Sequence, residues 1–253
     1  MQKQSGQIEM SVLVPVMNEA GNIRPLIDEI CAALNGRSFE ILYVNDGSDD
    51  GSLAELEACQ KDIPQLRVLS HEKRSGQSAA IRSALLASHG ALIAVLDGDG
   101  QNVPADLPAL EQALLAQRPA LGMAGGVRAK RQDSSSRKYA SVAARIIRRR
   151  LLGDSHPDSG CGIKIVDRAI FLRLPFFNHM HRFMPTLVRR EGGVVLAVPV
   201  QHRQRAVGQS KYKILDRLLV GISDILGVIW LLRRAANPGQ ITESNPKTSS
   251  DKT

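Results

Sequence analysis

Several features that mark common protein classes are missing from this sequence. Its three cysteines lie far apart and none belongs to a CxxC pair, so neither a disulfide framework nor a zinc site is indicated. Residues 1–9 are polar and the next apolar run is short, so we expect no secretory signal peptide at the start. The reducing cytoplasm is the environment that these absences favour.

The positive charge is unevenly distributed. The chain has 253 residues, of which 43% are hydrophobic and 23% charged, enough for one large α/β domain or two small ones. The net charge is +8, and residues 128–150 hold nine Lys or Arg against one acid, which accounts for the whole excess. Such a segment indicates a polyanionic partner: membrane head groups, phosphorylated ligands or nucleic acid. Tyr139 is its single aromatic residue, so stacking on nucleic acid bases is disfavoured.

Strand and helix patterns alternate over the first hundred residues. Apolar runs predict strands at 11–16, 39–44, 66–69 and 92–96. Helices are predicted at 22–34, with Asn22 as its cap, from Ser52, with Glu55 at capping-box spacing, and at 77–88. This alternation predicts a doubly wound, mostly parallel sheet of the α/β class.

The stretch from Leu92 to Gln101, LIAVLDGDGQ, carries the clearest functional signal in the sequence. Five apolar residues predict a buried parallel strand, and Asp97 and Asp99 fall on the same side where that strand ends. Two carboxylates, with the amide oxygen of Gln101 two residues further on, suit Mg²⁺ or Mn²⁺ bound to a diphosphate. An acidic β-turn is the structural alternative, because Asp and Gly are common in turns.

Two further predicted strands end in polar clusters, Asn18 with Glu19 and Asn45 with Asp46. The carboxyl ends of neighbouring parallel strands share one edge of a sheet, so we expect the three clusters to form one crevice. Neither a GxGxxG fingerprint nor a P-loop follows the first strand. A nucleotide would therefore be held by carboxylates and a metal rather than by a glycine-rich loop.

Four segments of the N-terminal part of the chain resemble, in order and spacing, the GT-A domain of family 2 glycosyltransferases: VPVMNE, VNDGSDDGS, RSGQSAAIRSAL and VLDGDGQNVP. Later segments are similar to the dolichol- or polyprenyl-phosphate mannose synthase branch: GGVR, RKYAS, DSGCGIK and RAVGQSK. The resemblance implies a GT-A domain, Rossmann-like and doubly wound, over residues 9–212.

The resemblance also implies where a nucleotide-sugar donor would bind. The nucleoside would lie against Pro15, Met17, Glu19, Val44 and Asp46, with Asp97 and Gly98 beneath it. An acid often stands where this chain has Asn45, which leaves Asp46 as the expected nucleoside contact.

The resemblance also implies a second set of residues, which would bind the metal and the phosphates. Asp99 and Gln101 would hold Mg²⁺ or Mn²⁺, with Asp97 close by. Arg128, Arg205 and Lys211 would face donor phosphates or the acceptor phosphate, and Arg137 and Ser141 match an acceptor-phosphate motif. The expected catalytic residues are Asp99, Arg128, Arg137, Arg205 and Lys211.

For several of these residues, a purely structural role is the alternative to a functional one. Arg205 and Lys211 could belong to a solvated basic loop, and His179, His181 and His202 are expected to be core or surface histidines rather than metal ligands. Asp158 fits a turn cap as well as a functional role, and Gly125 with Gly126 fits a tight turn.

The chemistry of sugar transfer, considered without the family, also favours a site that combines a metal ion with arginines. Breaking a sugar–phosphate bond places negative charge on the departing diphosphate, which a metal ion and fixed arginines stabilise. A phosphate monoester acceptor, with a second pKa of about 6, is already an anionic nucleophile near neutral pH. No general base is then required, and in-line displacement with inversion at the sugar carbon is expected.

Two segments suggest contact with a membrane surface. In residues 139–151, apolar positions recur at the i, i+3, i+4 spacing of an amphipathic helix, and arginines occupy much of the rest. Residues 213–235 predict an amphipathic helix whose apolar core, 218–232, is shorter than the ~20 residues of a membrane span, so we expect it to lie in the interface. Docking of this helix on the GT-A domain is the alternative. Residues 1–8 and 236–253 are expected to be disordered.

Together these features predict a metal-dependent enzyme, peripheral on the cytoplasmic face of a membrane. It would move a hexose, mannose from GDP-mannose being the first expectation, onto a polyprenyl phosphate such as a dolichyl or undecaprenyl phosphate. The alternatives are a UDP-sugar donor carrying glucose or an N-acetylhexosamine, and a non-catalytic protein that binds anions or a membrane.

Overall fold

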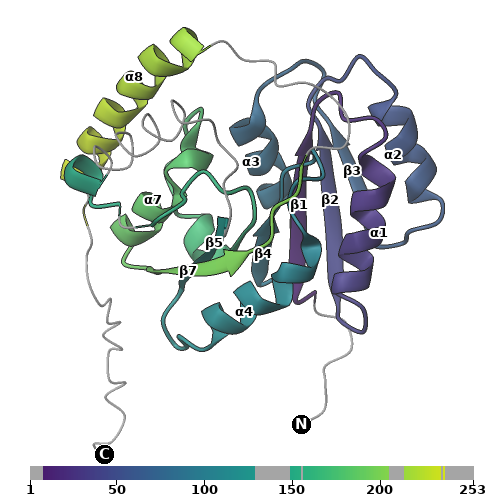
Figure 1. Ribbon diagram of the computed structural model, residues 1–253, viewed down its shortest axis with the longest axis horizontal. Coiled ribbons are helices and arrows are strands. Elements are labelled where there is room, and N and C mark those ends of the chain that lie inside the picture. The colour runs from purple at the N-terminus through teal and green to yellow at the C-terminus, as the bar shows by residue number, and fades with distance from the viewer. Residues whose placement is uncertain (1–7, 129–148, 155, 205–213, 235, 237–253) are drawn as a thin grey trace, which may run out of the picture.

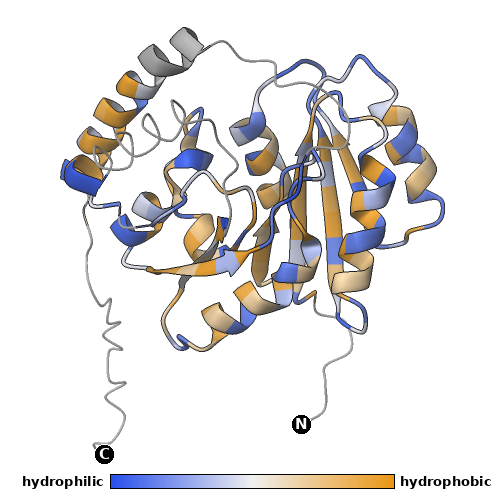
Figure 2. Cartoon of the chain, viewed as in Figure 1, coloured by the Kyte–Doolittle hydropathy of each residue, from blue (hydrophilic) through white to orange (hydrophobic). Residues whose placement is uncertain are grey.

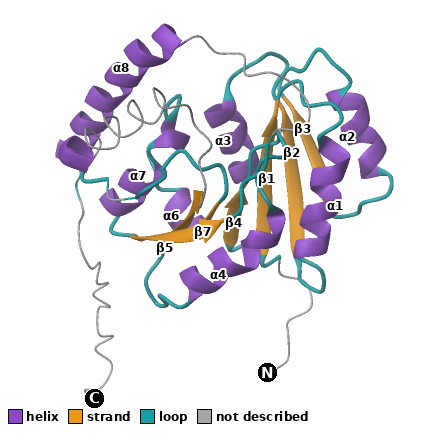
Figure 3. Ribbon diagram, viewed as in Figure 1, coloured by secondary structure: helices purple, strands orange, loops and turns teal. Residues whose placement is uncertain are grey.

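The computed structural model describes residues 8–128, 149–154, 156–204, 214–234 and 236. A seven-stranded mixed sheet forms its centre, in the order β3-β2-β1-β4-β6-β5-β7 (Figures 1 and 3). The strands are β1 (Met10–Val16), β2 (Phe39–Asn45), β3 (Leu66–Ser70), β4 (Leu92–Val95), β5 (Gly122–Arg128), β6 (Lys164–Asp167) and β7 (Val194–Val200).

The first half of the sheet is parallel, as the sequence predicts. β1 pairs with β2 and β4, and β2 with β3, all in parallel. β6 runs antiparallel to both β4 and β5, while β5 and β7 are parallel to each other. The prediction of an α/β fold with a mostly parallel sheet is confirmed, and each strand predicted in the first hundred residues lies within about one residue of its expected bounds.

Helices cover both faces of the sheet. They are α1 (Ile23–Ala33), α2 (Ser52–Gln60), α3 (Gln77–Ala87), α4 (Leu107–Leu115), α6 (Arg168–Phe171), α7 (Met184–Arg190) and α8 (Ile214–Arg233), with short 3₁₀ turns η1 (Pro104–Asp106) and η2 (Met180–Arg182). One core cluster lies under α1, α2 and α4, and the other under α3, α6, α7 and α8. The strands between them are mostly hydrophobic (Figure 2), and most of their apolar residues are buried, as is typical of a sheet covered on both faces.

The ends of two helices differ from the expected capping. Asn22 precedes α1, but its side chain donates to Glu19 and makes no cap hydrogen bond. The carboxylate of Glu55, from the first turn of α2, accepts instead from the amides of Gly21 and Arg24, at 2.7 and 3.0 Å. The capping box predicted within α2 is therefore wrong, because Glu55 caps the neighbouring helix and so joins the loops after β1 and β2.

Gly125 and Gly126 lie inside β5, so the tight turn considered for them is wrong. A Cβ atom at Gly125 would lie 2.6 Å from the ring of His156, and one at Gly126 would lie 2.7 Å from Ile163. Close packing across this strand, rather than turn geometry, explains why glycine stands at both positions.

Helix α8 packs against the domain beside α7 (Figure 1). Val228 is fully buried in the second core cluster, and Asp224 pairs with His179 at 3.0 Å. Ile222, Leu226 and Trp230 are 51%, 62% and 60% exposed. The predicted helix is therefore present and docked on the domain, with Asp224 on the contact side. No helix in the described part of the chain is long and apolar enough to cross a membrane.

Candidate active site

The loops that follow β1 and β2 form one hydrogen-bonded unit. Asn18 adopts a left-handed conformation with φ of 58°, and its side chain exchanges hydrogen bonds with Asp49. The amide of Glu19 donates to the hydroxyl of Ser52 at 2.9 Å. Two of the polar clusters expected at the strand ends therefore lie together, as the parallel pairing of β1 with β2 requires.

The residues expected to contact a nucleoside lie on these loops or in the strand ends that lead into them, but not all of them expose their side chains. Pro15 stands opposite Val44 in the β1–β2 register, and Pro15, Met17 and Glu19 are half-buried. Val44 is fully buried in the core. A ligand at this edge would therefore meet the backbone of Val44 rather than its side chain.

Asp46 is fully engaged by the loop that precedes α3. Its carboxylate accepts hydrogen bonds from His71 Nδ1 at 2.7 Å, from the amide of Ser75 at 2.8 Å and from the amide of Gly76 at 2.7 Å. Asp46 thus fixes the 71–76 loop against β2, and the nucleoside contact expected for it stays a prediction.

Asp97 and Asp99 stand just beyond the end of β4, where the sequence predicts them. Asp97 accepts a hydrogen bond from Gln77 of α3 at 2.8 Å, and Asp99 accepts one from the amide of Gln101 at 3.1 Å. Burial raises the pKa of Asp97, and the nearby charge of Asp99 raises it further. Two close carboxylates that repel each other create a site that favours a cation.

Two glycines allow this acidic segment to approach the sheet. A Cβ atom at Gly98 would overlap the side chain of Val16 at the end of β1, and one at Gly162 would overlap the carboxylate of Asp97. The Asp97 carboxylate therefore lies directly against the backbone of the Gly162 loop. Larger residues at either position would displace the acidic pair from the end of β1.

Arg203 attaches the acidic segment to the rest of the domain. Its guanidinium donates to the carbonyl of Gly100 at 2.7 Å and to the carboxylate of Glu29 in α1 at 2.9 and 2.5 Å. The amide of Arg203 also donates to the carbonyl of Gln101 at 3.1 Å. The segment after β7 therefore holds the loop of Asp99 and Gln101 in place, a role that the sequence alone does not reveal.

At the end of β5, Arg128 forms a two-pronged ion pair with Asp158. Arg128 Nε lies 2.7 Å from Asp158 Oδ2, and Nη2 lies 2.8 Å from Oδ1. The charge of Arg128 acts on Asp97 and on His202, which brings this arginine into the electrostatic neighbourhood of the acidic pair. Asp158, whose role the sequence leaves open, positions Arg128.

The carboxylates fit a divalent ion that substrate phosphates help to hold. In the described residues no group of three or more His, Cys, Asp or Glu side chains is arranged to hold a metal. Mg²⁺ is commonly bound by only one or two carboxylates together with substrate phosphates, so Asp97 and Asp99 are a sufficient protein contribution. Such an ion would neutralise charge on a departing diphosphate.

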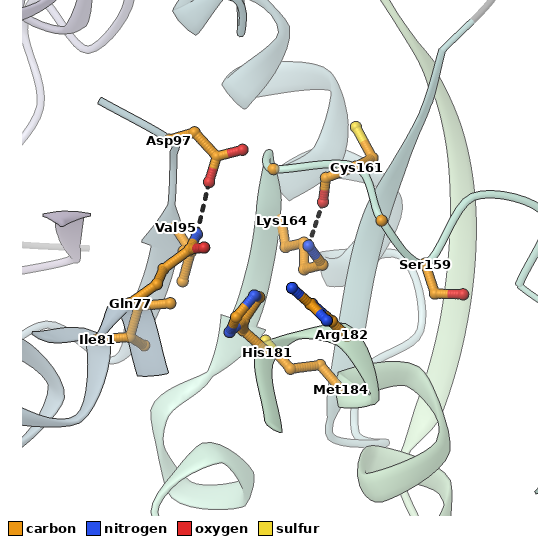
Figure 4. A pocket seen from close by; sticks show the side chains of 12 residues that line it. Gln77, Ile81, Val95, Asp97, Ser159, Cys161, Lys164, His181, Arg182 and Met184 are labelled. Carbon is orange, nitrogen blue, oxygen red and sulfur yellow. Dashed lines mark hydrogen bonds between the residues drawn. The ribbon is translucent and has the colours of Figure 1, made fainter. Parts of the chain in front are cut away.

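Beside Asp97 lies a cavity of about 380 Å³ that sequence reasoning missed (Figure 4). Lys164 of β6 is buried in its wall, where its ammonium group donates to the carbonyl of Cys161. Burial lowers the pKa of Lys164, and the charge of Asp97 opposes that shift. His181 also lines the cavity, and burial together with the charge of Lys164 lowers its pKa to about 3. His181 is therefore neutral at physiological pH.

Four expected site residues lie outside the described part of the chain: Arg137, Ser141, Arg205 and Lys211. Most of the basic segment 128–150 lies outside it too. Among the described site residues, Asp97, Gly98, Asp99, Gln101 and Arg128 gather at one edge. Pro15 lies near the end of β1, and Met17, Glu19 and Asp46 lie on the adjoining loops.

Residues 11–174 match the sequence pattern of the family described as "Glycosyl transferase family 2". The chain belongs to this family. The matched range begins in β1 and continues past β6 to Leu174, so it includes the acidic segment and both members of the Arg128–Asp158 pair. The prediction of a family 2 glycosyltransferase with a GT-A architecture is confirmed.

Two curated relatives of this family 2 glycosyltransferase carry names that specify lipid-linked sugars. A dodecaprenyl-phosphate galacturonate synthase from Rhizobium johnstonii is 33% identical over 92% of this chain and 70% of its own. An undecaprenyl-phosphate 4-deoxy-4-formamido-L-arabinose transferase from Pseudomonas aeruginosa is 33% identical over 86% of this chain and 64% of its own. The chain thus spans about two thirds of the length of these relatives.

Solved structures share the fold of this family 2 glycosyltransferase. Glucosyl-3-phosphoglycerate synthase from Mycobacterium tuberculosis, solved with Mn²⁺, UDP-glucose and glycerol 3-phosphate, matches with a TM-score of 0.65 and 19% identity over 92% of this chain and 82% of that one. A mannosyltransferase from Pyrobaculum calidifontis, solved with GDP-mannose and Mn²⁺, matches with a TM-score of 0.61 and 19% identity over 91% and 71%.

Proposed function

We propose that this chain transfers a sugar from a nucleoside diphosphate donor to a polyprenyl phosphate, with a divalent metal ion. The observation that carries the proposal is the meeting of Asp97 and Asp99 with the fixed cation Arg128 at one sheet edge. Carboxylates can hold a metal against the donor diphosphate, and an arginine can bind phosphate oxygens. The names of the two relatives, both polyprenyl-phosphate enzymes, agree with this acceptor.

The acceptor chemistry needs little from the protein beyond positioning. A phosphate monoester is anionic near neutral pH and attacks the sugar carbon directly. The metal would supply charge stabilisation to the leaving diphosphate, while Arg128 would orient phosphate oxygens. Arg137, Ser141, Arg205 and Lys211 complete the proposed phosphate contacts.

GDP-mannose is a less favoured donor than the sequence suggests. The names of the two relatives specify galacturonate and 4-deoxy-4-formamido-L-arabinose, and neither specifies mannose. The proposal therefore extends to nucleotide sugars as a class, with GDP-mannose and UDP-sugars tested side by side.

We further propose that the enzyme works at a membrane surface, on the cytoplasmic face where nucleotide sugars occur. The outer side of α8 carries three exposed apolar side chains one turn apart, Ile222, Leu226 and Trp230, with the exposed Arg233 and Arg234 at its end. Apolar side chains flanked by cations suit an interfacial helix. This placement would bring a lipid-borne phosphate close to the enzyme.

A transfer assay tests the proposed function. The protein is incubated with a panel of radiolabelled GDP- and UDP-sugars, a short-chain prenyl phosphate and Mn²⁺ or Mg²⁺, and lipid-extractable label is counted. We expect label in the lipid phase for at least one donor, and loss of it with EDTA. Thermal stabilisation by UDP or GDP that requires Mn²⁺ is the matching binding readout. The absence of transfer from every donor would overturn the proposal.

A further inference from the structure

We propose that the cavity beside Asp97 binds a carboxylate on the donor sugar, so that the donor is a nucleotide-activated uronic acid. This inference rests on the proposed function and adds the class of the transferred sugar. It starts from the buried Lys164, the last residue of the DSGCGIK segment, to which neither the resemblance nor the proposed transfer step gives a role. The juxtaposition that carries it is a buried ammonium group and a guanidinium group on the wall of one sugar-sized cavity.

The cavity has the size and construction of a small-molecule site. Its volume of about 380 Å³ lies within the range of roughly 300–1,000 Å³ that such sites occupy. Ile81, Val95 and Met184 supply an apolar part of the wall that suits a face of a sugar ring. Gln77 and His181 add polar groups for hydroxyls (Figure 4).

The charges of the lining are mainly positive. Lys164 and Arg182 contribute two cations, and Asp97 is the single acid that lines the cavity among the described residues. His181 bonds through Nδ1 to the hydroxyl of Ser78 at 2.8 Å, so a ligand would meet its Nε2. The hydroxyls of a neutral sugar could also accept from these cations, but a carboxylate would gain a stronger, charge-assisted hydrogen bond from each, so this lining favours an anion.

A buried ammonium group is costly unless an anion compensates it. The ammonium group of Lys164 donates its hydrogen bond to a neutral group, the carbonyl of Cys161. Asp97 and, less strongly, Asp158 provide opposing charge nearby, but the proposed metal would draw on Asp97, and Asp158 is already paired with Arg128. A sugar carboxylate that enters the cavity would supply the additional negative charge, and it could bind Lys164 and Arg182 together.

The position of the cavity matches the donor sugar. Asp97 lies both at the proposed diphosphate site and on the cavity wall, and the sugar is the group bonded directly to the diphosphate. The two relatives divide on this point, because galacturonate carries a carboxylate and the formamido-arabinose does not. The cationic lining of this chain favours the charged sugar.

Matched donor pairs test the inference whichever base the donor carries. UDP-glucuronate is compared with UDP-glucose, UDP-galacturonate with UDP-galactose, and GDP-mannuronate with GDP-mannose, all with a short-chain prenyl phosphate and Mn²⁺. We expect kcat/KM for the acid to exceed that for its neutral partner by about 10- to 100-fold in at least one pair, the value of a hydrogen bond between charged groups. Lys164→Met should reduce this ratio to within about threefold of unity.

Arg182→Gln is the second variant, because Lys164→Met removes a buried charge and its folding must be checked by circular dichroism. It should lower the acid-to-neutral ratio by about tenfold. Arg173→Gln, at an exposed arginine outside the cavity, is the matched control and should retain the wild-type ratio.

The outcomes separate this inference from the proposed function. Transfer from neutral sugars in preference to acids would overturn the inference and leave the function intact, whereas no transfer from any donor would overturn the function itself. A raised KM for prenyl phosphate in both variants, with an unchanged donor ratio, would assign the cations to the acceptor phosphate and would likewise overturn the inference.

Discussion

Arg128 and Asp158 face each other through two parallel hydrogen bonds, 2.7 and 2.8 Å long, across 30 residues of sequence. Their side chains are only 19% and 7% exposed, so the geometry is held by packing as well as by charge. A bidentate pair fixes the plane of the guanidinium group, which determines the direction from which this cation can meet a phosphate.

The first prediction concerns this pair. Asp158→Asn should lower kcat by about 10- to 100-fold with a smaller effect on donor KM, because Arg128 would lose its fixed orientation. Steady-state kinetics measure the effect, and Arg128→Lys should behave similarly. If Asp158 acts through Arg128, the double variant will be little worse than either single one, whereas additive losses would contradict that role. Asp28→Asn, in the exposed Arg24–Asp28 pair, is the control.

The second prediction concerns the acidic pair. Asp99→Ala should abolish the Mn²⁺-dependent part of thermal stabilisation by a nucleoside diphosphate and reduce transfer by at least about 100-fold, because one of two carboxylates for the ion is lost. Differential scanning fluorimetry with and without Mn²⁺ measures it. Asp62→Ala removes an exposed carboxylate that is not among the site residues and should change neither quantity. Wild-type transfer by Asp99→Ala would refute the metal assignment.

The strands and helices of residues 10–101 could be predicted from the sequence because the local pattern and the tertiary structure agree there. Apolar runs such as Leu92–Val95 are buried, and turn residues such as Asp97 and Gly98 follow within three residues. Parallel pairing then places the strand ends at one edge, which is why the clusters at Asn45 and Asp99 could be assigned to one site from the sequence pattern.

The remaining features depend on contacts between distant parts of the chain. β6 is four residues long and begins with Lys164, so neither length nor periodicity predicts a buried strand there. Asp158 resembles a turn cap until Arg128 is placed beside it. Glu55 has capping-box spacing in its own helix yet caps α1, because only the folded chain brings Gly21 within reach.

The third prediction concerns the outer side of α8. Leu226→Glu combined with Trp230→Glu should weaken binding to anionic phospholipid vesicles by about tenfold or more, because two exposed apolar side chains would no longer enter the interface. Vesicle co-sedimentation measures the binding. Leu86→Glu, at an exposed leucine of α3, is the matched control and should bind normally. Equal binding by the double variant and the wild type would contradict the membrane contact.

The fourth prediction concerns the pH dependence of stability, and it follows from the buried His181. Burial and the charge of Lys164 lower the pKa of His181 to about 3, from an ordinary 6.5. Between these values the unfolded chain binds a proton that the folded chain does not, so the stabilising contribution is complete above pH 6.5 and is lost as the pH falls towards 3.

His181→Gln should therefore reduce the loss of unfolding free energy that occurs as the pH falls. Between about pH 7.5 and 5 we expect the wild type to lose roughly 1–2 kcal/mol more than the variant, or about 2–6 °C in Tm, because a proton no longer favours the unfolded state. Thermal melts followed by circular dichroism at the two pH values measure the difference, with Arg173→Gln as a control that keeps His181. If the variant and the wild type lost stability in parallel, His181 would have to be accessible to protons in the folded protein, and its assignment as a neutral group in the cavity would be wrong.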